Sequence, residues 1–181
     1  MNTLVRIVLA GALCAVIVET ADAQRAQARD GFWFAAGPGW GSLGCGDCDG
    51  RESGMSGALA LGGTLNDRWL LGGTANGWTK SEDGATLSVA VVTALARFYP
   101  MAASGFFVQA GLGFGKVEVG ATFEGSSFSV GESGAGAILG VGYDVRVSSN
   151  ISVSPYWNAY AMSTDLFDAN VGQLGLALTV H

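Results

Sequence analysis

The residues with the most distinctive chemistry are the two cysteines of Cys45-Gly46-Asp47-Cys48. In an oxidising compartment such a close pair is expected to form a local disulfide, which adds only about 1–2 kcal/mol because the ring is small. A redox-active pair needs a cation or a helix N-terminus to lower a thiol pKa, and the one cation nearby is Arg51. No second Cys or His pair completes a zinc site. We therefore predict a structural disulfide between Cys45 and Cys48.

Three carboxylates near these cysteines offer the oxygen ligands that Ca²⁺ and Mg²⁺ prefer. Asp47, Asp49 and Glu52 form a candidate divalent-cation site, although their spacing is that of an incomplete calcium loop. The alternative is a solvated acidic loop that binds no ion.

The loop is expected to connect β-strands, and the clearest strand pattern lies at residues 170–181. There apolar side chains alternate with small or polar ones. The apolar set is Leu174, Leu176, Leu178 and Val180, and the other set is Gln173, Gly175, Ala177 and Thr179. A period of two predicts a β-strand with two unlike faces. A tilted strand of about 9–11 residues is long enough to cross a bilayer within a closed barrel.

Seven further segments show strand patterns. The eight expected strands cover residues 31–40, 53–65, 68–79, 86–99, 105–119, 133–146, 151–162 and 170–181. Short connections at 66–67, 100–104 and 147–150 alternate with the other gaps, of which 43–52 and 120–132 are long. An even strand number, with short turns on one side and longer loops on the other, is typical of outer-membrane barrels. We expect the lumen to hold a polar network of Arg68, Gln109, Asp144, Arg146, Tyr156, Asn158 and Tyr160. In an eight-stranded barrel such side chains fill the interior; the alternative is a charged gate in a narrow channel.

The N-terminal residues resemble a secretory signal peptide. Arg6 precedes an apolar run over 7–18, and Ala21-Asp22-Ala23 matches the small-x-small pattern that signal peptidase cleaves. We predict a signal peptide over 1–23, a short segment over 24–30 and a barrel over 31–181, with 26–28 as a second cleavage pattern.

Composition supports the same compartment. Only 13% of the residues are charged against 49% hydrophobic, and no stretch after the signal reaches the roughly 18 apolar residues of a membrane helix. A soluble secreted barrel, the alternative, usually exposes more Lys and Glu. The net charge of −6 and the absence of a basic run argue against a nucleic-acid partner.

The mature chain resembles the small eight-stranded outer-membrane barrel family, which includes the transmembrane domain of outer membrane protein A and the outer-membrane protein X type. The resemblance rests on Gly31-Phe32-Trp33-Phe34, the Gly-rich strand 108–115, the segment 140–146 and the closing strand 170–181. It implies an all-β, eight-stranded, antiparallel, up-and-down transmembrane β-barrel in the outer membrane of a Gram-negative cell. It also implies contact with outer-membrane lipid and lipopolysaccharide, and recognition of strand 170–181 by the barrel-insertion machinery. His181 stands where the family usually ends in an aromatic residue, commonly Phe.

These features predict a structural or interaction protein that presents acidic surface loops, with a narrow porin-like pore for small solutes or ions as the alternative. The expected outer loops carry nine carboxylates against Arg51 and Lys80, so Ca²⁺ or Mg²⁺ is expected to bridge this rim to lipopolysaccharide phosphate. A lipid-modifying enzyme is disfavoured because the single histidine, His181, falls at the chain end and on the expected periplasmic side. We expect neither enzymatic activity nor a cofactor.

Overall fold

The computed structural model describes residues 29–181 except 47–49, 83, 124–125 and 165–167. The described residues form one antiparallel sheet. Its strands are β1 (Phe32–Cys45), β2 (Glu52–Asn66), β3 (Trp69–Glu82), β4 (Ala85–Phe98), β5 (Phe106–Phe123), β6 (Ser126–Tyr143), β7 (Val145–Arg146), β8 (Ile151–Ser163) and β9 (Asp168–Val180). The described part of the chain contains no helix with the length and apolar composition needed to cross a bilayer.

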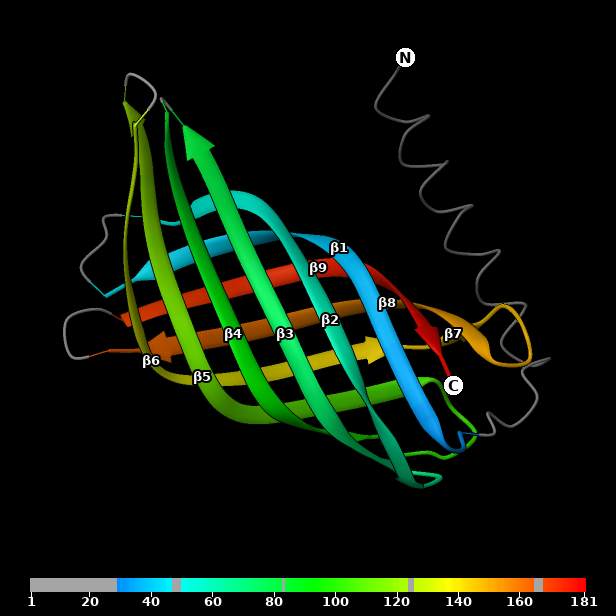
Figure 1. Ribbon diagram of the computed structural model, residues 1–181. Helices are drawn as coiled ribbons and strands as arrows, with labels where there is room; N and C mark the ends of the chain where they lie inside the picture. The colour runs from blue at the N-terminus through cyan, green and yellow to red at the C-terminus, as the bar shows by residue number, and fades with distance from the viewer. Residues whose placement is uncertain (1–28, 47–49, 83, 124–125, 165–167) are drawn as a thin grey trace, which may run out of the picture.

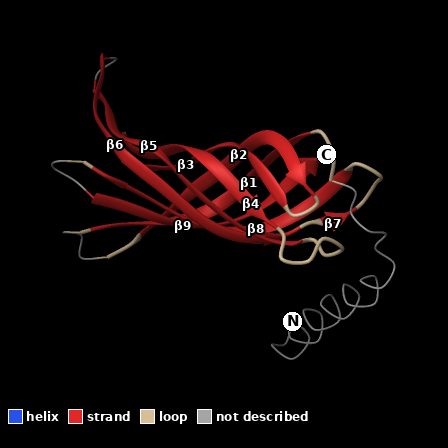
Figure 2. Cartoon of the chain, turned by 90° about the horizontal axis from the view of Figure 1, so that it is seen from below, coloured by secondary structure: helices blue, strands red, loops and turns tan. Residues whose placement is uncertain are grey.

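The sheet closes on itself into a barrel. Consecutive strands pair from β1 to β6 and from β7 to β9, β1 pairs with β9, and β6 pairs with β8. β7 continues the line of β6, and both pair with β8. The two therefore count as one strand of the barrel, which is eight-stranded (Figures 1 and 2). The predicted eight-stranded antiparallel barrel is confirmed.

The break between β6 and β7 has a local cause in Pro155. The pairs Gly142↔Tyr156 and Val145↔Val153 belong to one uninterrupted register, so no residue is inserted. Proline cannot donate a backbone hydrogen bond to a neighbouring strand, and the pairing with β8 is interrupted opposite it. On the other side of the strand, the amide of Asp144 donates to the carbonyl of Gly105 at 2.9 Å and continues the β5–β6 register by one residue.

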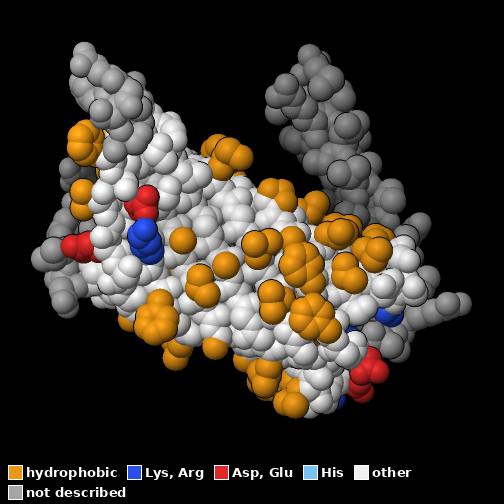
Figure 3. Space-filling model, viewed as in Figure 1, with side chains coloured by type: hydrophobic (Ala, Val, Ile, Leu, Met, Phe, Trp, Pro, Cys, Tyr) orange, Lys and Arg blue, Asp and Glu red, His pale blue; other side chains and the backbone are white. Residues whose placement is uncertain are grey.

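The two faces of the strands differ as the parity predicted. On β5, Leu112 and Phe114 point outward and are 75% and 78% exposed, whereas Gln109 is buried inside. Large apolar side chains cover the middle of the outer wall and charged ones gather towards its ends (Figure 3). This is the pattern of a wall that faces lipid.

Strand lengths differ from the prediction most over 120–132, and β1 also runs to Cys45, beyond its expected end at 40 and into the expected loop over 43–52. The expected loop over 120–132 is largely strand, because β5 runs to Phe123 and β6 begins at Ser126. The resulting β5–β6 hairpin projects beyond the barrel (Figures 1 and 2). The predicted turn at Asn66-Asp67 is confirmed, since Asn66 Oδ1 accepts hydrogen bonds from the amides of Arg68 and Trp69, both at 3.0 Å.

Candidate functional site

The half of the lumen near His181 is organised around the carboxylate of Asp144, which is fully buried. Tyr99 donates its hydroxyl to Oδ2 at 2.7 Å, and Ser154 donates to Oδ1 at 2.6 Å. The Ser154 hydroxyl also lies 2.8 Å from that of Thr179 on β9. His181 Nε2 lies 3.8 Å from Asp144 Oδ2. Asp144 therefore links the chain after β4, the β6–β7 break, β8 and β9.

A second set of hydrogen bonds starts from Arg97 on β4, whose guanidinium lies over the ring of Phe107 at 4.2 Å. Its Nε donates to Gln109 at 3.1 Å, Gln109 donates to Asn158 at 2.8 Å, and Asn158 donates to Asn76 at 3.1 Å. This row crosses the lumen from β4 and β5 to β8 and β3. These hydrogen bonds pair side chains of the row with one another, as in a stabilising buried network, although Arg97 Nη1 is buried without a hydrogen-bond partner among the described residues.

The predicted lumen residues divide into two groups. Those buried inside the barrel are Gln109, Asp144, Tyr156, Asn158 and Tyr160. The prediction that Arg68 lies in the lumen is wrong, because Arg68 is exposed in the turn before β3. Arg146 is only half-buried, and its Nη2 donates to the carbonyl of Ser149 in the following turn. Arg97 is an interior arginine that the sequence did not reveal, because its strand is apolar on both faces.

Arg29, in the segment before β1, covers the same end of the lumen. Its guanidinium is buried and lies 3.4 Å from the ring centre of Tyr99. Nη1 donates to the carbonyl of Ala102 at 3.0 Å and Nη2 to that of Ser104 at 2.6 Å. Arg29 thus ties the N-terminal segment to the β4–β5 turn, and no periodicity marks this role in the sequence.

The other half of the lumen, towards the projecting β5–β6 hairpin, is apolar. Side chains with almost no exposure meet there, among them Trp78, Val89, Val91, Ile138, Tyr160, Met162 and Val171. Trp78 also donates its indole N–H to the carbonyl of Gly41 at 3.1 Å. Between the two sets of polar side chains, a cavity lined by Gln109 and Asn158 on one side and Ser154 and Thr179 on the other has a volume of about 20 Å³, which holds about one water molecule. This packing argues against the pore alternative.

Where β5 and β6 extend beyond the barrel, their outward face becomes charged and their inward face becomes apolar. On β5 the outward side changes from Phe114 to Lys116 and Glu118, which are 2.5 Å apart. The inward side becomes apolar at Val119, which pairs with Val130 on β6. An outward change from apolar to charged marks the end of the lipid-facing wall.

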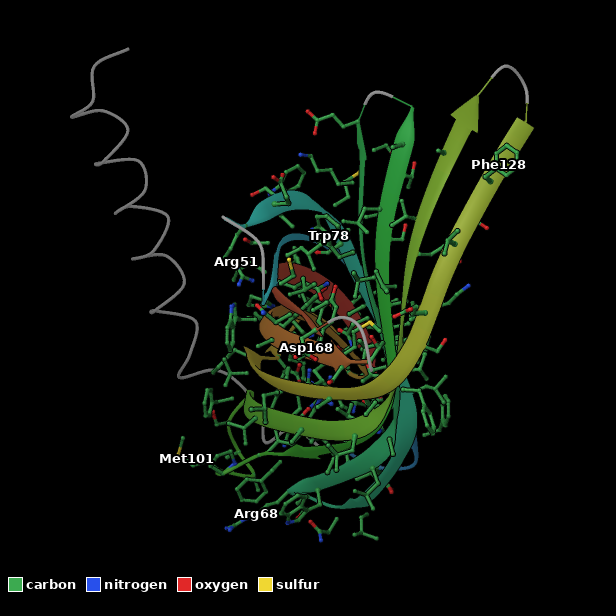
Figure 4. All side chains as sticks on the ribbon, turned by 90° about the vertical axis from the view of Figure 1, so that its left-hand side faces the viewer. Arg51, Arg68, Trp78, Met101, Phe128 and Asp168 are labelled. Carbon is green, nitrogen blue, oxygen red and sulfur yellow. The ribbon has the colours of Figure 1, made fainter. Side chains whose placement is uncertain are left out.

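The inner face of this projecting sheet is an exposed apolar surface. Val119, Phe128 and Val130 are 51%, 69% and 76% exposed, and Figure 4 shows Phe128 on the arm of β6, away from the barrel mouth. The β6–β8 ladder stops at Ala135↔Ser163, so no strand among the described residues pairs with the outer edge of β6 before Ala135. Exposed edges and apolar faces mark interaction surfaces.

The predicted cysteine loop is described only in part. Cys45 is disulfide-bonded, whereas Cys48, Asp47 and Asp49 lie outside the described residues, so the predicted pairing and cation site stay predictions. Glu52 begins β2, and its carboxylate accepts a hydrogen bond from Lys80 at 2.6 Å. The described residues contain no group of three or more His, Cys, Asp or Glu side chains that could hold a metal ion.

Lys80 lies between two of the predicted rim carboxylates. Its Nζ is 2.6 Å from Glu52 and 2.7 Å from Glu82. The hydrogen bond with Glu52, followed by that with Glu82, raises the pKa of Lys80. The hydrogen bond from Lys80 in turn lowers the pKa of Glu82. This part of the rim is therefore partly neutralised by its own lysine.

Comparison with known proteins places the fold. No protein-family model and no curated protein sequence matches the chain. Neisserial surface protein A is similar in structure with a TM-score of 0.62 and 16% identity, over 82% of this chain and 96% of that one. Ail, the attachment invasion locus protein of Yersinia pestis, gives 0.60 and 12% identity over 83% and 99%, and its complex with the heparin analogue sucrose octasulfate gives 0.59 and 14% over the same shares. The protein has the fold of the small eight-stranded outer-membrane β-barrels.

Proposed function

We propose that this protein is an outer-membrane interaction protein, in which a closed barrel holds a partner-binding β-sheet above the cell surface. The observation that carries the proposal is the reversal of polarity along β5 and β6. On β5, Lys116 and Glu118 face outward beyond Phe114. Val119, Phe128 and Val130 face inward and remain exposed, with Glu132 on the same inward side nearer the barrel. A sheet that served only to lengthen the barrel would have no use for an exposed apolar inner face.

The chemistry of the site indicates a partner that supplies an apolar surface or an extended strand. Addition of a strand to the free edge of β6 would satisfy its backbone groups, and apolar side chains would cover Phe128 and Val130. The sheet also carries Glu82, Glu118 and Glu132, which favour a cationic rim on the partner. The net charge of −6 does not favour a polysulfated ligand like that of the Ail complex.

An attachment role follows from this surface, and the neighbour named for attachment and invasion supports it. The filled lumen supports anchoring over transport, and the acidic loops are proposed to assist through bound Ca²⁺ or Mg²⁺. The single histidine, His181, lies at the opposite end from the sheet, where its amide donates to the carbonyl of Asn150 at 2.9 Å. This position supports a function without catalysis at the cell surface.

An adhesion measurement tests the proposal. Phosphatidylcholine vesicles that carry the protein are expected to adhere to cultured epithelial cells, and Phe128→Ser with Val130→Ser is expected to abolish most of this adhesion. The matched control is Ser129→Ala with Ser133→Ala, which alters the opposite, outward face of the same strand. Equal adhesion by the parent and the Phe128/Val130 variant would contradict the proposed surface.

A further inference from the structure

The outer wall of the barrel carries a groove that lies apart from the projecting sheet. It has a volume of about 710 Å³ and crosses β1, β9, β8 and β6. Its floor is a row of small outward residues, because Ser42 pairs with Gly172 and Gly172 pairs with Ala159. One row nearer the periplasm, Trp40 and Trp157 flank Leu174 and form a bulky ledge.

The extracellular end of the groove holds a cation. Arg51, in the connection before β2, reaches across the outside of β1 to β9 (Figure 4 shows it at the rim). Its Nε donates to Ser42 Oγ at 3.0 Å, its Nη1 to Asn170 Oδ1 at 2.6 Å, and its Nη2 to the carbonyl of Ser42 at 2.5 Å. A Cβ on Gly44 would lie 2.6 Å from Nη1, so glycine makes room for the guanidinium there.

The charge of Arg51 is available at this position. Within the described ranges, no carboxylate lies within 4.0 Å of its guanidinium, although Lys80 and Lys116 both have such partners. The four hydrogen bonds of Arg51 to described residues go to neutral oxygens, and a guanidinium has five N–H donors. A cation fixed by neutral partners is ready to receive an anion without losing much side-chain freedom.

We propose that this groove binds one phosphorylated lipid of the outer leaflet. An acyl chain would lie over Gly172 and Ala159 and rest on the ledge of Trp40 and Trp157, and its phosphate would contact Arg51. The position of the groove determines what occupies it. This part of the wall faces lipid, so an apolar hollow there must be filled by lipid chains. Charge complementarity then selects the lipid, since Arg51 lies where the chain meets its headgroup. The site is independent of the proposed partner-binding sheet.

The opposite wall supplies a matched control. A second groove, of about 770 Å³, has Gly57, Gly77 and Ala90 on its floor and no cation in its lining. Side chains can be added to either floor without a backbone clash, because a Cβ on Gly172 would lie 4.0 Å from Arg51 Nη2 and one on Gly57 would lie 3.6 Å from the carbonyl of Gly37. Gly172→Leu and Gly57→Leu therefore fill equivalent grooves.

Native mass spectrometry of the full barrel in dodecyl maltoside micelles tests the site. The probes are bisphosphorylated lipid A and the same lipid with both phosphates removed. We expect the parent to bind the phosphorylated form about tenfold more tightly, which is the size of one charge-assisted contact. Arg51→Gln should reduce that preference to about twofold and leave phosphate-free binding unchanged. Gly172→Leu should weaken binding of both forms.

The controls are Arg68→Gln, which removes an exposed arginine at the other end of the barrel, and Gly57→Leu. Both are expected to bind as the parent does, and heat-modifiable migration verifies that each variant is folded. An unchanged phosphate preference in folded Arg51→Gln would overturn the headgroup contact. An equal loss in Gly57→Leu and Gly172→Leu would show general coating of the wall by lipid and would overturn the site.

Discussion

Replacing Asp144 with asparagine tests whether the buried charges of the lumen hold the barrel together or gate a channel. The carboxylate accepts short hydrogen bonds from Tyr99 and Ser154, and it attracts the guanidinium groups of Arg29 and Arg97. Asparagine keeps the shape and one acceptor oxygen but removes the charge. The structural interpretation therefore predicts a large loss of stability and no gain of conductance.

The size of the loss follows from the contacts that change. A hydrogen bond to a charged group contributes about 1.5–3 kcal/mol, and the asparagine amide must also find an acceptor among hydroxyls that now donate to Asp144. We expect the free energy of unfolding to fall by about 2–4 kcal/mol for Asp144→Asn. For Ser154→Ala we expect the free energy of unfolding to fall by about 1–2 kcal/mol, because Tyr99 still donates a hydrogen bond to the Asp144 carboxylate.

The assay is equilibrium unfolding in urea, with the protein in phosphatidylcholine vesicles and tryptophan fluorescence as the signal. The control is Asp168→Asn, an exposed carboxylate at the start of β9, which should change stability by no more than about 0.5 kcal/mol. A loss below about 1 kcal/mol for Asp144→Asn would refute the reasoning. A rise in single-channel conductance without loss of stability would identify Asp144 as a gate.

Three other predictions follow from the lipid-facing wall, the rim and the cysteine loop. Leu112→Arg places a cation on the lipid-facing wall and should cost about 2–4 kcal/mol in the same urea assay; a cost below about 1 kcal/mol would mean that this side chain does not face lipid. Because Lys80 lowers the folded-state pKa of Glu82, the contribution of this pair is present above the unfolded pKa of Glu82 and is lost as pH falls through its folded pKa. Lys80→Met should raise the pKa of Glu82 in an NMR titration, and an unchanged value would exclude the contact in solution. Cys45 and Cys48 should give one disulfide and no free thiol by alkylation mass spectrometry without reductant, and the double serine variant should still insert.

The local pattern of residues determined much of this fold. Alternation of side chains along a strand is a property of neighbouring residues, so the faces of Leu112, Gln109 and Asn158 follow from sequence alone. The turn at Asn66 could be predicted for the same reason, because its side chain bonds amides only two and three residues away. Closure into a barrel then follows, since eight such strands would otherwise leave edges unpaired in lipid.

Tertiary structure decided what local alternation left open. The strand of Arg97 is apolar on both faces, and only its pairing with β5, where Arg97 lies opposite Gln109, turns the guanidinium into the lumen. The expected loop over 120–132 is strand because Val119 and Val130 pair across a hairpin, and the reversed polarity of its faces hides that strand from a search for lipid-facing alternation. Arg29 and Arg51 act through contacts with residues far along the chain, such as Ser104 and Asn170. Their roles depend on which distant segments the closed sheet brings together, and no local period encodes that.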